Sequence, residues 1–159
     1  MEYASLIKEF GNRYGMDDLV PNENGGVGFA VDGRTMTLRH QVETDDVIAM
    51  IEIVDVPEAG VAAVNRLLMQ ANQALFIQDG LMLILQAETG KYCLLARFGI
   101  AALDFIGFDE KLGRFLERAD QWGEFFAKFF PLAAEAEARG DDPVEMPSDF
   151  LSPLEMMRV

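Results

Sequence analysis

Histidine and cysteine supply most general bases, thiol nucleophiles and zinc ligands, and this chain contains one of each. His40 lies on the apolar face of an alternating segment, which favours a partly buried, hydrogen-bonded side chain over a general base. Cys93 stands between Tyr92 and Leu94 with no basic residue directly beside it to lower the thiol pKa, so it is expected to be a buried small hydrophobic residue. A zinc site of the His/Cys type needs more ligands than these two residues provide.

Three acidic pairs, Asp17-Asp18, Asp45-Asp46 and Asp141-Asp142, each stand at a predicted turn or cap. Paired carboxylates can hydrolyse glycosides or bind calcium, but the spacing of an EF-hand loop and its final glutamate are missing. Solvated turn residues and helix caps explain the pairs better. No metal site is therefore expected.

Glycine spacing does not indicate an enzyme either. The stretch Gly25-Gly26-Val27-Gly28 leads into a strand, whereas a phosphate cradle needs a following helix N-terminus and a Lys or Ser/Thr behind it. No Gly-x-Ser-x-Gly elbow is present. We therefore predict a binding protein rather than an enzyme, with no cofactor.

The composition restricts the class of partner. The chain of 159 residues carries 27 acidic and 13 basic residues, a net charge of −14, and is 50% hydrophobic. Such a negative field repels phosphate backbones and anionic lipids, so neither nucleic acid nor membrane insertion is expected. No segment reaches the roughly 20 apolar residues of a membrane helix, and no signal peptide is recognised. A single cysteine excludes an internal disulfide and fits a reducing cytoplasm.

The elements that must position any binding site follow from hydrophobic periodicity. Helical spacing predicts helices over residues 2–14, from about residue 60 onward, and over 109–138, where Pro131 interrupts or restarts the last one. Alternation predicts strands at 27–31 and 35–42, joined by the turn signal Asp32-Gly33.

Three further strands are predicted at residues 47–54, 81–87 and 91–98. The strand at 47–54 is almost continuously apolar, which suits a strand covered on both faces. The predicted fold is thus α+β, a twisted antiparallel sheet of about five strands with three helices in the order α-β-β-β-α-β-β-α. Residues 1–138 form a single domain, and 139–159 form an acidic C-terminal tail, either flexible or folded back onto the domain.

Two features indicate binding surfaces. Phe125, Phe126, Phe129 and Phe130 cover a wide arc of the last helix. Either they form an exposed interaction patch, or a sheet on one side and the tail on the other bury them. The hairpin that opens the sheet also leaves a free edge, to which an extended peptide can add a strand.

Several segments, together with chain length and acidity, match one known family in order and spacing over about residues 3–130. They are Leu6-Ile7-x-x-Phe10 ending at Gly15, Phe29-Ala30-Val31-Asp32-Gly33-Arg34, Leu67-Leu68-Met69-Gln70-Ala71-Asn72, Gly80-Leu81, Glu88-Thr89-Gly90 and a final helix containing Phe115. The chain resembles the class I type III secretion chaperones, the family that includes the Tir chaperone. No single motif is specific; the resemblance rests on their combination.

The resemblance implies a homodimer and an apolar groove for a secreted effector. The dimer would form through the second helix and the following strand, at Leu67, Leu68, Ala71, Leu75, Leu81 and Leu83. The effector-binding groove would form between the first helix and the sheet, at Leu6, Phe10, Phe29, Val31, Met36 and Leu38.

The function implied by the resemblance is that of an ATP-independent cytoplasmic chaperone. It would bind the N-terminal region of a type III secretion effector in extended form and keep it soluble and secretion-competent. The alternative is a non-enzymatic regulatory protein of the same fold that binds a cytosolic regulator. The negative charge suits either role, because it keeps a protein with apolar surface in solution.

Overall fold

A computed structural model of the protein describes residues 2–101 and 103–141. The order of elements is the predicted one, three helices and five strands in the sequence α-β-β-β-α-β-β-α. They are α1 (Tyr3–Tyr14), β1 (Gly26–Val31), β2 (Arg34–Gln41), β3 (Asp46–Asp55), α2 (Val61–Asp79), β4 (Leu81–Gln86), β5 (Lys91–Gly99) and α3 (Phe105–Arg139). The predicted tail lies outside the described residues from position 142 onward.

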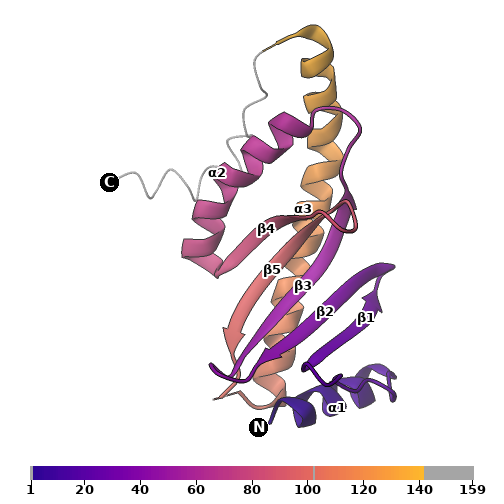
Figure 1. Ribbon diagram of the computed structural model, residues 1–159, viewed down its shortest axis with the longest axis vertical. Coiled ribbons are helices and arrows are strands. Elements are labelled where there is room, and N and C mark those ends of the chain that lie inside the picture. Colours follow the sequence, from indigo (N-terminus) through magenta and orange to yellow (C-terminus); the bar gives the residue numbers. More distant parts are fainter. Residues whose placement is uncertain (1, 102, 142–159) are drawn as a thin grey trace.

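The five strands form one antiparallel sheet in the order β1-β2-β3-β5-β4 (Figure 1). Asp32 and Gly33 join β1 to β2 with φ values of 49° and 77°, which confirms the predicted turn with two positive φ angles. The connection through α2 places β4 at the outer edge, beyond β5. The sheet therefore has two edge strands, β1 and β4, that lie far apart in space and in sequence.

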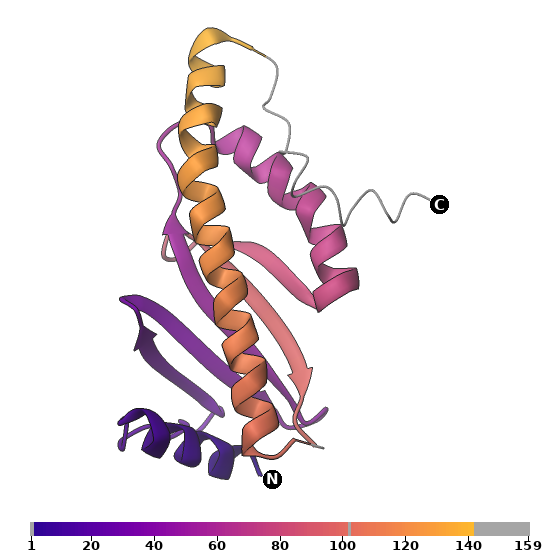
Figure 2. The ribbon, with the colours of Figure 1, turned by 180° about the vertical axis from the view of Figure 1, so that it is seen from behind.

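Helix α3 lies across one face of the sheet along most of its length and extends past its end (Figure 2). Side chains on that face are buried, among them Val47, Ala49 and Ile51 of β3. On the opposite face, Ile48 and Met50 are only half-buried. The prediction that β3 is covered on both faces is thus wrong, because none of the described helices lies over the second face of β3.

Helix α3 begins four residues before the predicted start. The Asp104 carboxylate accepts a hydrogen bond from the backbone N–H of Gly107 at 2.9 Å and caps the first turn. The helix continues through Pro131, which neither ends nor restarts it. Pro131 is exposed, and the hydrogen bond it removes leaves a carbonyl near solvent.

The phenylalanine cluster of α3 is buried, which decides between the two alternatives. Phe125, Phe126 and Phe129 are almost inaccessible, and Phe130 is half-buried. The Phe126 ring stacks on Tyr92 of β5 at a centroid distance of 5.5 Å, and Phe125 stacks on Phe129 at 5.3 Å. These rings are core of the protomer rather than an exposed patch.

Helix α2 is attached to the far half of α3. Gly60, which precedes α2, has a φ of 75°, and its backbone N–H donates a hydrogen bond to the Glu137 carboxylate. A Cβ at position 60 would lie 2.8 Å from the Cβ of Ala133, so only glycine fits this contact. None of the helices among the described residues is long and apolar enough to span a membrane.

Candidate binding surfaces

His40 and Cys93 have the structural surroundings that the sequence indicates. The imidazole of His40 stacks on Tyr3 at 4.8 Å, and its Nε2 lies 2.9 Å from a carboxylate oxygen of Asp45. Cys93 is buried, and burial, with a smaller contribution from Glu52, raises the pKa of its thiol to about 11. The histidine is partly buried and hydrogen-bonded as predicted, and the cysteine is an unreactive core residue.

The acidic pairs are not assembled into a metal site within the described residues. No group of three or more His, Cys, Asp or Glu side chains in residues 2–101 and 103–141 is close enough to hold a metal ion. Asp45 lies in a turn with a φ of 52°, and Asp46 pairs with Arg97 of β5. Hydrogen bonds from Thr44 and Arg97 lower the pKa of Asp46. Asp142 lies outside the described residues.

The six residues predicted for an effector groove come from α1, β1 and β2, and Figure 1 shows α1 lying next to the end of the sheet that β1 and β2 form. Leu6, Met36 and Leu38 have no accessible surface, and Phe10 is nearly buried. Phe29 and Val31 of β1 are half-buried and are the members that reach the surface. The four buried side chains therefore pack underneath Phe29 and Val31, and a bound polypeptide can contact this region only along β1.

Phe10 connects the three elements of this region. Its ring lies 5.5 Å from Phe29 of β1, 4.7 Å from Tyr14 and 6.3 Å from Phe108 of α3, measured between centroids. The Tyr14 hydroxyl donates a hydrogen bond to Asp109 at 2.8 Å, which fixes the end of α1 against α3. We name the surface formed by Tyr14, Phe29 and Val31 the α1–β1 surface. It is an apolar strip on a rigid aromatic support.

The backbone of β1 is open along the same strip. The Gly26 N–H bonds the side chain of Asn22 at 2.9 Å and its C=O accepts from the Asn22 N–H at 2.8 Å, so both groups of Gly26 face away from β2. Backbone groups alternate in direction along a strand, so those of Gly28 and Ala30 face the same way. Both of these residues are exposed. Two donors and two acceptors at the edge beside the α1–β1 surface therefore have no partner among residues 2–101 and 103–141.

The six residues predicted for a dimer interface lie where α2 packs on β4. Leu67, Leu68, Ala71, Leu81 and Leu83 are buried within the protomer, and Leu75 is half-buried. These side chains attach α2 to its own sheet. The apolar groups that remain available are on the outer side of α2.

Three large apolar side chains, Met69, Phe76 and Ile77, form a stripe on the outer side of α2. Met69 is 79% exposed and Phe76 is 63% exposed. On the adjoining β4, Leu85 is exposed and lies on the same face of the sheet as Leu81 and Leu83, whereas Met82 is exposed on the opposite face. We name Met69, Phe76, Ile77 and Leu85 the α2–β4 surface. Sequence reasoning missed it, although the recurrence of apolar residues at 69, 76 and 77, outside the inward stripe, was a visible signal.

Two asparagines of α2 hold the helix against the sheet. Asn72 donates to the C=O of Leu83 at 2.9 Å and accepts from the N–H of the same residue at 2.7 Å. The Asn65 side chain accepts a hydrogen bond from the buried hydroxyl of Tyr92 at 2.8 Å. Asn72 thus occupies the outer hydrogen-bonding groups at the middle of β4, in the way a neighbouring strand would. The sequence analysis gave Asn72 no role.

The fold and these surfaces define a small α+β protein whose accessible features, an open strand edge and two apolar strips, are suited to binding other polypeptides. The model of the Tir chaperone protein (CesT) family matches residues 5–123. The chain belongs to this family and is a type III secretion chaperone. No curated protein matches the chain in sequence.

Several solved structures with the same fold are complexes of two different proteins. The ExsC–ExsE complex contains a chain 26% identical over 78% of this protein and 96% of that chain, with a TM-score of 0.69. The HopA1–SchA chaperone–effector complex matches at 17% identity over 77% and 93%, with a TM-score of 0.62. The Yersinia pestis chaperone SycH, in complex with a fragment of YscM2, matches at 16% identity over 76% and 98%, with a TM-score of 0.54.

Proposed function

We propose that this chaperone binds the N-terminal region of a type III secretion effector in extended form and keeps it soluble and ready for secretion. It works in the cytoplasm, as a homodimer, without ATP and without catalysing a reaction. The observation that carries the proposal is the open edge of β1 beside the α1–β1 surface, since both features suit an extended chain.

An extended segment adds to β1 as a sixth strand. The outward backbone groups of Gly28 and Ala30 provide hydrogen bonds that do not depend on the side chains of the client. Specificity comes from alternate client side chains that contact Phe29 and Val31, because alternate residues of a strand point to the same face. The buried ring of Phe10 makes this surface rigid, so little ordering accompanies binding.

The α2–β4 surface is the interface of the proposed homodimer. Exposed apolar stripes of this kind are unusual on a monomer, and they are covered when two copies pack face to face. In a two-fold dimer the same stripe of each copy faces its counterpart, so exposed apolar side chains of one α2 meet those of the other. The net charge of −14 keeps the assembly in solution while it carries a non-globular client.

Purification of a tagged chain from its native host, followed by mass spectrometry, tests the proposed function. We expect an N-terminal effector segment at two chaperone chains per client chain. A dimer that carries a cytosolic regulator instead would replace the client assignment with the regulatory alternative. A monomer with no bound protein would contradict the proposal.

A further inference from the structure

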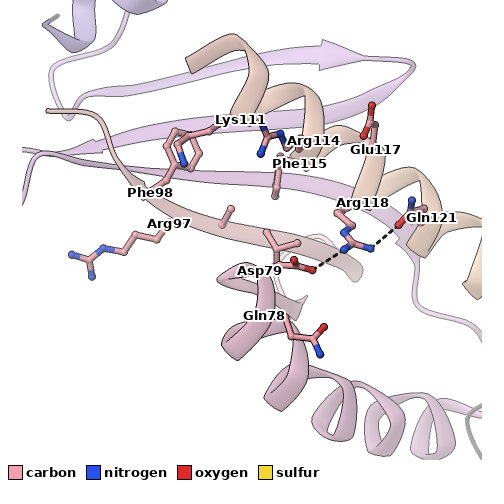
Figure 3. A pocket seen from close by; sticks show the side chains of 12 residues that line it. Gln78, Asp79, Arg97, Phe98, Lys111, Arg114, Phe115, Glu117, Arg118 and Gln121 are labelled. Carbon is pink, nitrogen blue, oxygen red and sulfur yellow. Dashed lines mark hydrogen bonds and ion pairs between the residues drawn. The ribbon is translucent and has the colours of Figure 1, made fainter. Parts of the chain in front are cut away.

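A cavity of about 590 Å³ lies between the end of α2, the strands β4 and β5, and the first half of α3 (Figure 3). Its lining contains four basic side chains, Arg97, Lys111, Arg114 and Arg118, against two acidic ones, Asp79 and Glu117. Because Arg97 pairs with Asp46 and points away from the cavity, the other lining side chains leave one positive charge in excess, whereas the whole chain carries 14 negative charges in excess. The sign of this local charge distinguishes the cavity from the acidic surface around it.

Two of the four cations are already engaged in structural pairs. Arg118 bonds Asp79 at 3.0 Å and thereby joins α3 to the end of α2. Arg97 binds Asp46 and points away from the cavity in Figure 3. The cations that remain for a ligand are the two nearest the N-terminus of α3, at positions 111 and 114.

Lys111 and Arg114 are exposed and weakly paired. The Nζ of Lys111 lies 5.8 Å from the centroid of the Phe98 ring, and no carboxylate among the described residues lies within 4.0 Å of it. Arg114 reaches only the exposed carboxylate of Glu110, at 3.5 Å. An exposed pair of this kind contributes little, so both cations can turn toward an incoming anion at small cost.

The spacing of the cations suits an extended polypeptide. Residues 111 and 114 share one face of α3, separated along the axis by roughly 4.5 Å. Alternate side chains of an extended chain recur every ~6.6 Å, and the long, flexible side chains of Lys111 and Arg114 can spread to that separation. Between the cations, Phe98 and Phe115 supply an apolar floor for the intervening side chains.

We propose that this cavity binds a short acidic stretch of the client, with Asp or Glu at alternate positions and apolar residues between them. The inference rests on the proposed function only in taking the ligand to be an extended polypeptide. Two or three carboxylates are enough, because a carboxylate farther than ~8 Å from the cations is screened at physiological salt and adds little to binding. A nucleic acid extends beyond the cavity and meets the negative field of the remaining surface.

Fluorescence anisotropy with a labelled peptide of sequence Gly-Ser-Glu-Val-Glu-Val-Glu-Gly-Ser tests the inference on the full chain. A second peptide carries glutamine in place of each glutamate. We expect the acidic peptide to bind about tenfold more tightly than its glutamine counterpart, and the difference to shrink as salt rises. Equal binding of the two peptides, or no binding of either, would overturn the inference.

The double substitution Lys111→Gln with Arg114→Gln is expected to lower affinity for the acidic peptide about tenfold. Lys128→Gln serves as the control, since Lys128 is exposed on the same helix outside the cavity. A similar loss in the control would assign the binding to general electrostatics. Thermal unfolding establishes that each variant folds; Arg118 is left intact because it holds α2 to α3.

Two further binding experiments identify the class of ligand. Pyrophosphate or a short single-stranded oligonucleotide that displaces the acidic peptide at lower concentration than unlabelled peptide would overturn the assignment to a polypeptide. A client fragment obtained by co-purification provides the link to function. If that fragment binds the unmodified chain while the acidic peptide does not, this inference fails and the chaperone proposal stands.

Discussion

The two edge strands of the sheet, β1 and β4, have opposite surroundings. At β4, the amide of Asn72 bonds both outer backbone groups of Leu83, and α2 lies alongside the strand. At β1, the outward groups of Gly28 and Ala30 have no strand beside them in the part of the chain that the structure describes. An unprotected edge invites pairing with any extended chain, so proteins normally cover or shorten it. Here one edge is covered by the chain itself, and the other is left open.

Because of this difference, we expect the two edges to bind different partners. The blocked edge presents side chains, namely the apolar stripe on α2, and we infer that these bind a second copy of the protein. The open edge presents backbone, which binds extended chains with little regard to sequence.

The largest effect is expected from Phe76→Glu on the α2–β4 surface. A charge placed in an apolar interface is desolvated without a partner, so the dimer dissociation constant rises about 100-fold or more. Sedimentation velocity measures the change. Ile106→Glu is the matched control, because Ile106 is 64% exposed and Phe76 is 63% exposed, but Ile106 lies at the start of α3. Dissociation in the control alone, or in neither variant, would rule out this interface.

A smaller effect is expected from Asn72→Ala, which removes both hydrogen bonds to Leu83. The free energy of unfolding should fall by about 1–3 kcal/mol, because partly buried backbone groups of β4 lose their partners. Chemical denaturation measures the loss. Gln73→Ala on the exposed side of the same helix should change stability by less than about 0.5 kcal/mol. If the two variants unfold alike, the β4 edge does not depend on Asn72.

The thiol of Cys93 reports on opening of the same edge, since Cys93 pairs with Ile84 of β4. Burial raises its pKa from the ordinary value of 9.0 to about 11. At pH 8 the folded protein should therefore react with iodoacetamide about 100-fold more slowly than the unfolded chain. The rate should rise with pH up to about 11 and should be faster in Asn72→Ala. A fast reaction whose rate levels off near pH 9, as expected for an exposed thiol, would show that β4 opens readily.

Much of the fold follows from local sequence signals. Asp32-Gly33 requires two positive φ angles and so predicts its hairpin from two residues alone. The predicted start of α3 is four residues late, because the sequence alone does not show that the Asp104 carboxylate caps the helix through its hydrogen bond with the N–H of Gly107. The coverage of β3 could not be read from its apolar run, since that depends on where α3 packs.

The candidate sites were predicted less completely, for a physical reason. Periodicity identifies the side chains that face the core, such as Leu6 and Met36, but not the apolar residues that remain outside, such as Met69. The pairing of Asn72 with Leu83 and the ion pair of Arg118 with Asp79 join different elements. Such contacts appear only when the chain is folded.

The most direct test of the account concerns the outward N–H of Gly28. Gly28→Pro removes this donor and places a ring at the edge, yet it spares the hydrogen bonds to β2, which come from the alternate residues. Gly28→Ala keeps the donor, and its Cβ would lie an ordinary 3.8 Å from the Met36 carbonyl oxygen. The two variants therefore differ mainly in whether residue 28 can donate a hydrogen bond at the free edge of β1.

Isothermal titration with the co-purified client fragment measures the affinity of both variants, after thermal unfolding has established that each folds. The account predicts that Gly28→Pro weakens binding about tenfold or more, while Gly28→Ala stays within about twofold of the unmodified chain. Full affinity in a folded Gly28→Pro variant would contradict strand addition at β1.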